Sequence, residues 1–259
     1  MNDMPLLNVS YRAARVWQRN YDVFIRMWKT ELWPPFLEPI MQIVALGLGL
    51  GAYVTSINGM SFIQFIAPGF VASGVMFTAS FECMFGSYVR MEYQRTFDAI
   101  IATPATVEDV IAGEVLWATS RGVFAAIVVL IVMLVFGLVH SPWALLAVVV
   151  AAVEGIMFAA LAITFTAVVP SIDNFNYLIT LGLTPMFLFS GVYFPIENLP
   201  PTLQKLAWFS PLTHAVLPIR GLVLGQPGMW MVWDVLWMIV VGAALFITAL
   251  YLMRRRLIN

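Results

Sequence analysis

The chain has 259 residues, of which 61% are hydrophobic and only 10% are charged, and its mean hydropathy is +0.90. A soluble globular domain carries about 25% charged residues and cannot bury so much apolar surface within itself, so the composition is that of a membrane protein. The formal net charge of -1 gives no attraction to nucleic acid. With one cysteine, Cys83, and two distant histidines, the sequence predicts neither a disulfide within the chain nor a metal site.

The first predicted element is an amphipathic helix over residues 8–31. It is not a cleavable signal peptide, because the N-terminus is charged and lacks a continuous apolar core. A basic face opposite tryptophans is typical of a helix in the membrane interface, and we assign residues 1–33 to this role. The alternative is a charged face on a helix packed against protein. The residues that define the two faces are Arg12, Arg15, Arg19 and Arg26 on one side and Trp17 and Trp28 on the other.

Six apolar stretches follow, and each approaches the roughly 20 residues that a helix needs to cross about 30 Å of hydrocarbon. They cover residues 36–55, 62–87, 115–139, 143–169, 177–194 and 230–253. The sequence therefore predicts an all-α membrane protein with six transmembrane helices, in one transmembrane domain over residues 34–259. The fifth stretch is the weakest candidate.

Residues 195–229, between the last two stretches, are apolar but are divided by six prolines into pieces of about ten residues. Such pieces are too short to cross the membrane, so we expect short re-entrant or interfacial helices here.

Basic residues predict the orientation. An even number of spans places both chain ends on one side, and ten basic residues collect there, including Arg90, Arg95 and Arg254 to Arg256. The positive-inside rule then places both termini in the cytoplasm.

Four charged residues fall inside or at the edge of predicted spans: Glu38, Glu82, Arg121 and Glu154. Each costs a few kcal/mol at the bilayer centre, so each should face protein or water. Two interpretations stay open. These residues line a substrate or proton path, or they form structural ion pairs such as Arg121 with Glu82 or Glu154.

Sequence patterns of common catalytic sites are absent from the chain. There is no G-x-x-x-x-G-K-[ST] loop, no G-x-S-x-G elbow and no H-E-x-x-H pair. The glycines at 47, 49 and 51 lie in an apolar stretch, where small residues allow close helix packing. We therefore predict no catalytic residue, and an enzyme acting on lipids is disfavoured.

Residues 90–114 contain seven charged residues and predict a structured loop between the second and third spans. Thr106 to Asp109 has the pattern of a helix N-cap, just after Pro104, so a short helix should begin there and another should cover about 93–102. Capped helices in such a loop offer a rigid surface to a partner, although they can also simply fill a connection.

Three segments resemble the permeases of the ABC-2 type transporter family. RMEYQRTFDAIIATP at 90–104 is similar to the loop through which these permeases couple to an ATPase, and residues 183–200 with 209–225 are similar to their C-terminal signature. The residues of 90–96 and VPSIDNF at 169–175 resemble, more narrowly, the nodulation protein J branch, whose members export lipo-oligosaccharides.

The resemblance implies a type V exporter-like permease that forms a dimer, most simply a homodimer. It also implies two copies of a separate ATP-binding subunit, which binds MgATP, so this chain holds no cofactor of its own. The residues that it assigns to coupling are Glu92, Arg95, Thr96, Asp98, Thr103, Pro104 and Thr106.

We therefore expect a subunit that exports an amphiphilic lipid-linked saccharide or lipo-oligosaccharide across the bacterial inner membrane, in contact with membrane lipids. Candidate residues of the translocation path are Phe77, Phe81, Phe85, Glu82 and Glu154, although the aromatic residues can also be ordinary packing. One alternative is a drug or antibiotic efflux permease of the same family. Another is a proton-coupled carrier that uses Glu82 or Glu154.

Overall fold

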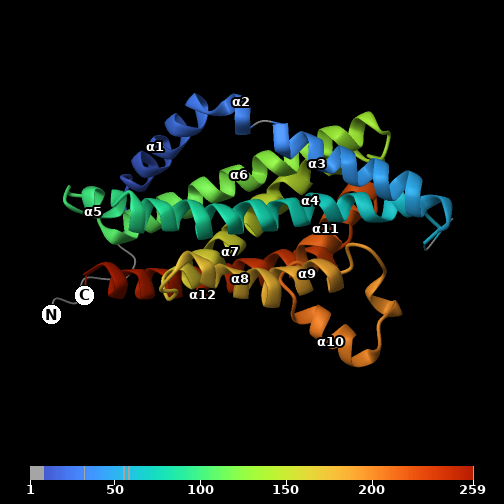
Figure 1. The fold of residues 1–259 in the computed structure, drawn as a ribbon. Helices are drawn as coiled ribbons and strands as arrows, with labels where there is room; N and C mark the ends of the chain where they lie inside the picture. Colours follow the sequence, from blue (N-terminus) through green and yellow to red (C-terminus); the bar gives the residue numbers. More distant parts are fainter. Residues whose placement is uncertain (1–8, 32, 55, 58, 259) are drawn as a thin grey trace.

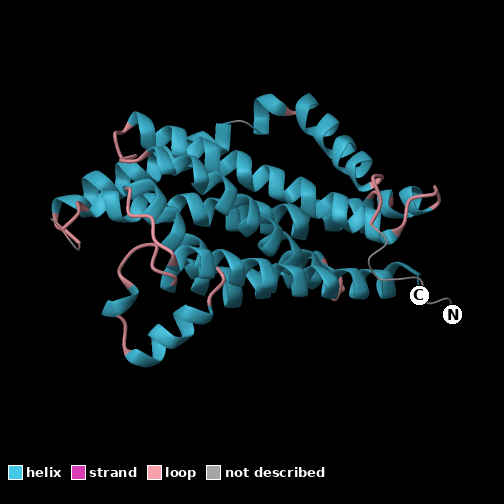
Figure 2. Ribbon diagram, turned by 180° about the vertical axis from the view of Figure 1, so that it is seen from behind, coloured by secondary structure: helices cyan, strands magenta, loops and turns pink. Residues whose placement is uncertain are grey.

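The computed structural model describes residues 9–31, 33–54, 56–57 and 59–258, and in these ranges the chain forms helices joined by loops, without a strand (Figure 1, Figure 2). Within the described ranges, five helical stretches are long and apolar enough to cross a membrane. These are Trp28–Ala52, Phe62–Tyr93, Val107–Val135, Pro142–Thr166 and Trp230–Ile258. The predicted all-α class is confirmed, but the length criterion is met by five stretches and not by six.

The predicted N-terminal helix is divided into two pieces, α1 (Ala13–Arg26) and α2 (Trp28–Glu31), with Met27 between them. Residues 1–8 of the predicted segment lie outside the described residues. The buried side chains of α1, Ala13, Val16 and Asn20, face the rest of the bundle, so α1 lies obliquely against α6 (Figure 1). The first apolar stretch is α3 (Trp33–Val44), which continues through a π-helical turn, Ala45–Gly49, and a 3₁₀ turn, Leu50–Ala52.

The second span is longer than its hydropathy predicts. α4 (Phe62–Phe81) begins at a capping box formed by Ser61 and Gln64, and its helical course continues through π-helical turns at Glu82–Gly86 and Val89–Tyr93. Arg90 and Glu92 therefore belong to a helix, not to a loop beginning at residue 90. The helix tolerates these charges because both side chains form ion pairs within the bundle.

The predicted cap at Thr106 is present, but it begins the third span and not a short loop helix. Thr106 Oγ1 accepts a hydrogen bond from Asp109 N at 3.2 Å, and Asp109 Oδ2 accepts one from Thr106 N at 3.1 Å. α6 (Val107–Val135) starts at this capping box. The connection between the two spans is thus reduced to residues 94–106, which contain α5 (Thr96–Ile101).

The centre of the bundle is formed by α4, α6 and α7 (Ala147–Thr166), which pack against one another. The last helix, α12 (Trp230–Ile258), packs on α7. α7 is preceded by a 3₁₀ turn at Pro142–Leu146, so the third and fourth spans are joined by a short connection, as the sequence predicts.

The fifth predicted stretch is a short, irregular helical segment that runs alongside α4. It consists of α8 (Phe175–Leu178), a π-helical turn at Ile179–Leu183 and α9 (Thr184–Phe189). At 1.5 Å per residue, its length of about 22 Å is below the thickness of the hydrocarbon core. Aromatic pairs fix its direction, because the Phe175 ring lies 5.3 Å from Phe85 and the Phe187 ring lies 5.3 Å from Phe77.

The proline-rich region forms α10 (Pro201–Phe209) and α11 (Thr213–Leu224), neither of which is long enough to cross a membrane. α10 projects from the bundle, whereas α11 packs against α4 (Figure 1). The backbone N–H of His140, in the connection before α7, donates to the carbonyl of Val223 at 3.1 Å, which places α11 at the end of the bundle opposite α5.

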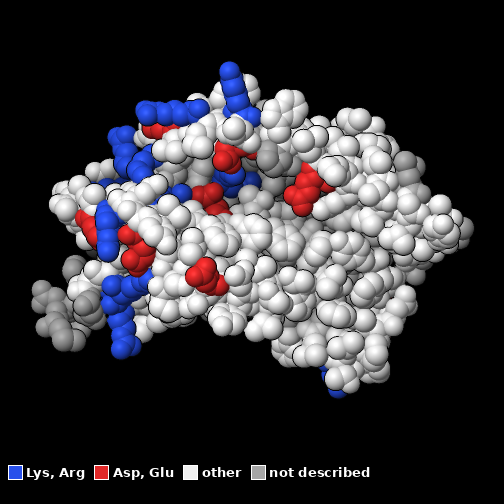
Figure 3. Space-filling view, viewed as in Figure 1, with Lys and Arg blue, Asp and Glu red and all other residues white. Residues whose placement is uncertain are grey.

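Both described chain ends lie at the α5 end of the bundle (Figure 1). Ser10 N donates to Asp109 Oδ1 at 2.6 Å, and Arg256 Nη2 lies 2.7 Å from Glu92 Oε1. Figure 3 shows that charged side chains gather toward this end, whereas much of the remaining face is uncharged. The distribution resembles that of a membrane protein with one strongly charged end.

The contact between α1 and α6 depends on Gly113. A Cβ atom added at Gly113 would lie 2.5 Å from Val16 Cβ and 2.8 Å from the Ala13 carbonyl oxygen. We therefore expect Gly113→Ala to displace α1, to lower the free energy of unfolding by about 1–3 kcal/mol and to expose α1 to protease. Gly49→Ala is the matched control, because an added Cβ at Gly49 meets no described atom within 4 Å. Equal protease sensitivity of the two variants would contradict this prediction.

Candidate functional site

A buried carboxylate, Glu114 of α6, connects three elements near the charged end of the bundle. Its side chain is 1% exposed and accepts hydrogen bonds from Arg90 Nε at 3.0 Å, Ser87 Oγ at 2.6 Å and Asn20 Nδ2 at 2.9 Å. Arg90 and Ser87 lie on the continuation of α4, and Asn20 lies on α1. Glu114 therefore joins α1, α4 and α6 at one junction.

A second set of ion pairs lies next to this junction. Arg121 Nη2 is 2.7 Å from Glu31 Oε2, and Arg121 Nε is 3.9 Å from Glu82 Oε2. Glu82 also pairs with Arg90 at 3.0 Å, which joins the two sets. The Arg121 guanidinium lies 4.8 Å from the centre of the Phe24 ring of α1, a cation–π contact.

These contacts bear on the two interpretations of the intramembrane charges. Arg121 pairs with Glu82, one of the two partners considered, and with Glu31, which the sequence does not suggest. Glu154 is fully buried in α7, and within the described chain neither of its carboxylate oxygens has a hydrogen-bond partner. Glu154 therefore lies apart from the ion pairs.

The Glu31–Arg121–Glu82 cluster separates two cavities. One, of about 480 Å³, lies among α3, α4, α6 and α9, and the other, of about 490 Å³, lies beneath α1. Glu31, Glu82 and Arg121 line both of them. We call the first the inner cavity and the second the α1 cavity. A molecule that moved from one to the other would have to pass these ion pairs.

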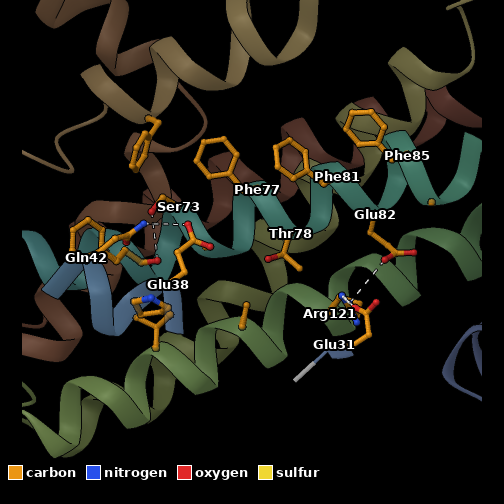
Figure 4. A pocket seen from close by; sticks show the side chains of 17 residues that line it. Glu31, Glu38, Gln42, Ser73, Phe77, Thr78, Phe81, Glu82, Phe85 and Arg121 are labelled. Carbon is orange, nitrogen blue, oxygen red and sulfur yellow. Dashed lines mark hydrogen bonds and ion pairs between the residues drawn. The ribbon is translucent and has the colours of Figure 1, made fainter. Parts of the chain in front are cut away.

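The inner cavity has an aromatic wall and a polar wall (Figure 4). The predicted Phe77, Phe81 and Phe85 follow one face of α4 at successive helical turns, with ring centres 5.6 Å and 5.9 Å apart, and Phe187 of α9 joins them. The polar lining comes from Glu38 and Gln42 of α3, Ser73 and Thr78 of α4, Glu82 of the π-helical turn after α4, Arg121 of α6 and Glu31 of α2. Glu154 does not line this cavity.

The residues assigned to coupling do not all lie on one free surface. Asp98 of α5 is exposed and pairs with Arg95 at 3.7 Å, and Thr96 lies beside them. Thr103 and Pro104 are also exposed, in the turn after α5. Glu92 instead pairs with Arg256, and Thr106 caps α6.

Phe97 fixes this loop to the bundle, because its side chain is fully buried between the half-buried Thr96 and the exposed Asp98. Arg95, which precedes α5, has a left-handed backbone with φ of 52°. The turn at Arg95 directs the chain away from the α4 helix, so that α5 forms a projecting, internally fixed surface at the end of the bundle (Figure 1).

The predicted interface helix agrees in part with both interpretations that the sequence left open, a helix in the membrane interface and a helix packed against protein. Arg15, Arg26 and Trp28 are exposed, as in an interfacial helix. Trp17 faces protein, because its Nε1 donates to Ser120 Oγ at 2.9 Å. Arg12 also turns to protein and donates to the Pro104 carbonyl.

Arg19 is the basic residue of α1 that lines the α1 cavity. Its guanidinium donates to Asn20 Oδ1 at 3.0 Å and lies 3.4 Å from Thr96 Oγ1 on α5. Burial and the neighbouring positive charge of Arg90 lower the pKa of Arg19. α1, α5 and the α4 continuation are thereby linked by polar contacts at the charged end.

Among the described residues, no group of three or more His, Cys, Asp and Glu side chains is arranged to hold a metal ion. The candidate site consists of the two cavities, the Glu31–Arg121–Glu82 cluster between them and the projecting loop that contains α5.

Comparison with known proteins identifies the family. The profile of the ABC-2 type transporter family matches residues 13–224, which is most of the chain. The chain belongs to this family. The assignment also confirms the prediction of a transport subunit rather than an enzyme.

Several relatives of this ABC-2 permease carry one name. Nodulation protein J of Sinorhizobium fredii (strain NBRC 101917 / NGR234) is 34% identical over 244 residues, which cover 94% of this chain and 93% of the relative. Nodulation protein J of Rhizobium leguminosarum bv. viciae is 36% identical over 212 residues, 82% of each chain. The inner membrane transport permease YadH of Escherichia coli (strain K12) is 26% identical over 212 residues, which cover 81% of this chain and 82% of the relative.

Proposed function

We propose that this permease exports an amphiphilic lipid-linked saccharide or lipo-oligosaccharide across the bacterial inner membrane, driven by two copies of a separate ATP-binding subunit. The observation that carries the proposal is the inner cavity, whose aromatic wall faces polar groups, next to a second cavity beneath an amphipathic helix. Similarity to nodulation protein J over most of both chains supports a saccharide-bearing substrate.

The proposed topology has six crossings, with both termini in the cytoplasm. Residues 175–192 would complete the fifth crossing, because they run beside α4 from Phe85 to Gly69, where a Cβ would meet Val192 at 2.9 Å. The charged end, with α5 and both described chain ends, would face the cytoplasm. Residues 1–33 would lie in the interface and residues 34–259 would form the transmembrane domain, with coupling in 90–114 and re-entrant helices in 195–229.

In the proposed transport step, the head group enters the α1 cavity from the side while its apolar tail stays in lipid. ATP-driven closure of the two partner subunits would move α5 and the adjoining end of the α4 continuation as a rigid-body shift. The contact of Arg19 with Thr96 would pass this movement to α1, and the ion pair of Arg256 with Glu92 would pass it to α12. Separation of Arg121 from Glu31 would then open the inner cavity. A second copy of the permease would complete the channel.

The test is to replace Thr96 or Asp98 with alanine in the permease reconstituted with its ATPase. We expect export of a lipo-oligosaccharide to fall at least about tenfold while ATP hydrolysis continues, because the exposed surface of α5 would no longer transmit movement. Asp173→Ala is the matched control, since Asp173 is an exposed carboxylate outside the loop. Normal export by the Thr96 and Asp98 variants would refute coupling through α5.

Drug efflux is the second candidate function, because the row of Phe77, Phe81, Phe85 and Phe187 also fits a hydrophobic drug. Export assays that offer a drug and a lipo-oligosaccharide to the same proteoliposomes distinguish the two. A proton-coupled carrier has less support, since Glu82 is held by two arginines and Glu154 lies apart from both cavities.

A further inference from the structure

The arginines in or next to the inner cavity are already paired with carboxylates. Arg121 is its only guanidinium among the described residues, and it is held by Glu31 and Glu82. Arg90, which lies just behind Glu82, is held by Glu82 and Glu114. A phosphate or sulfate in the cavity would therefore have to displace a carboxylate before it could bind a guanidinium.

Glu38 differs from the other carboxylates of the cavity. Its described contact is a hydrogen bond from Gln42 Nε2 to its Oε1 at 3.2 Å, and no Lys, Arg or His of the described chain pairs with it. Glu31, Glu38 and Glu82 thus face a cavity with one guanidinium, which leaves an excess of negative charge. In Figure 4, Glu38 and Gln42 lie together on α3, across the cavity from Arg121.

The polar lining is otherwise made of groups that bind hydroxyls. Carboxylates accept hydrogen bonds from hydroxyl groups. The Gln42 amide and the hydroxyls of Ser73 and Thr78 can each donate and accept hydrogen bonds. The phenyl rings beside them bind apolar surfaces such as the C–H face of a sugar or an alkyl chain. Such a lining suits a molecule that has hydroxyls and an apolar body but no negative charge.

We infer that the inner cavity selects a hydroxyl-bearing head group without negative charge and rejects one that carries phosphate or sulfate, with Glu38 as a specificity-determining residue. This inference rests on the proposed function, because it concerns the substrate of the same cavity. It narrows the substrate to an amphiphile whose saccharide and apolar part are joined without a phosphate. Glu38 disfavours a phosphate- or sulfate-bearing head group by like-charge repulsion, and it favours a neutral saccharide by accepting a hydrogen bond from a hydroxyl group.

The experiment measures binding of radiolabelled octyl β-glucoside and of its 6-phosphate, below their micelle concentrations, to the full-length permease in phosphatidylcholine nanodiscs. Empty nanodiscs give the lipid background, and the zwitterionic lipid does not itself repel the phosphate. We expect the neutral glucoside to bind at least about tenfold more tightly than the phosphate. Equal affinity, or tighter binding of the phosphate, would overturn the inference.

Variants at position 38 test the role of the charge. Glu38→Gln should reduce the ratio of the affinities for the neutral glucoside and its 6-phosphate at least about threefold, mainly by strengthening phosphate binding. The reason is that glutamine lacks the unpaired negative charge but has nearly the same size and still forms hydrogen bonds. Glu38→Asp keeps the charge and should keep the preference, and Glu197→Gln, an exposed carboxylate away from the cavity, should change nothing. An unchanged preference in a folded Glu38→Gln variant would show that Glu38 does not set it.

The outcomes separate this inference from the proposed function. If neither glucoside binds and the reconstituted complex does not export a lipo-oligosaccharide, both are wrong. If the two glucosides bind alike while ATP-dependent export persists, only the charge selectivity is wrong.

Discussion

Glu114→Ala is expected to lower the free energy of unfolding by about 3–5 kcal/mol and to release α1 from α6. The reason is that Glu114 is buried and accepts hydrogen bonds from Asn20, Ser87 and Arg90. Its loss leaves the largely buried Arg90 with Glu82 as its remaining carboxylate partner. Unfolding by SDS titration in mixed micelles measures the free energy, and protease cleavage within residues 10–31 measures the release of α1.

Two further variants show whether the charge is the cause. Glu197→Ala removes an exposed carboxylate and should change stability by less than about 0.5 kcal/mol. The double variant Arg90→Met with Glu114→Leu should recover part of the loss, because it removes both partners and leaves neither charge unpaired. If the double variant is less stable than Glu114→Ala alone, the account of an uncompensated buried charge is wrong.

Arg220→Met is expected to destabilise the end of the bundle opposite α5 by about 3 kcal/mol. Arg220 is buried in α11, and its guanidinium donates to the carbonyls of Phe65 at 3.0 Å and Gly191 at 2.6 Å. It also lies 3.9 Å from the centre of the Phe65 ring. Burial lowers the pKa of Arg220 to about 10, which still leaves it charged near pH 7.

Methionine keeps the apolar stem of Arg220 but leaves the carbonyls of Phe65 and Gly191 without their donor. SDS titration measures the loss, and cleavage in residues 191–212 should increase because this segment is no longer tied to α4. Arg220→Lys should recover part of the stability, whereas Arg255→Met, at an exposed position, should have little effect. Unchanged cleavage in Arg220→Met would show that the guanidinium does not hold this segment.

Much of the fold follows from local sequence properties. Apolar length predicts the five stretches that are long enough to cross a membrane, because a helix in lipid must satisfy its own backbone hydrogen bonds over about 20 residues. The cap at Thr106 and the divisions in the proline-rich region follow from the same local chemistry. The fifth stretch is less regular than its hydropathy suggests, since it contains a π-helical turn next to Pro185.

The end of the second span could not be predicted in this way. Charged residues after position 89 indicate a loop, yet the helix continues to Tyr93 because Glu114 and Arg256, from distant parts of the chain, neutralise Arg90 and Glu92. A helix can carry a charge inside a bundle when a partner from another helix is close, and that partner is invisible to hydropathy.

The residues of the candidate site likewise differ in whether the sequence predicts them. Helical spacing on one element predicts Phe77, Phe81 and Phe85, and a charge within a span predicts Glu82; all four line the inner cavity. Glu31, Gln42 and Phe187 come from other helices and were not assigned to it. Glu154 was grouped with the path because it is charged within a span, but it lies elsewhere.

The sequence by itself determined the lipid environment of this permease, most of its helices, its projecting loop and its family resemblance. Periodicity, capping and hydropathy act within one helix, so a single segment is enough to read them. Only the tertiary structure decided that Arg121 joins Glu31 to Glu82 and that this cluster divides two cavities. Those contacts join residues up to 90 positions apart, and helix packing alone brings them together.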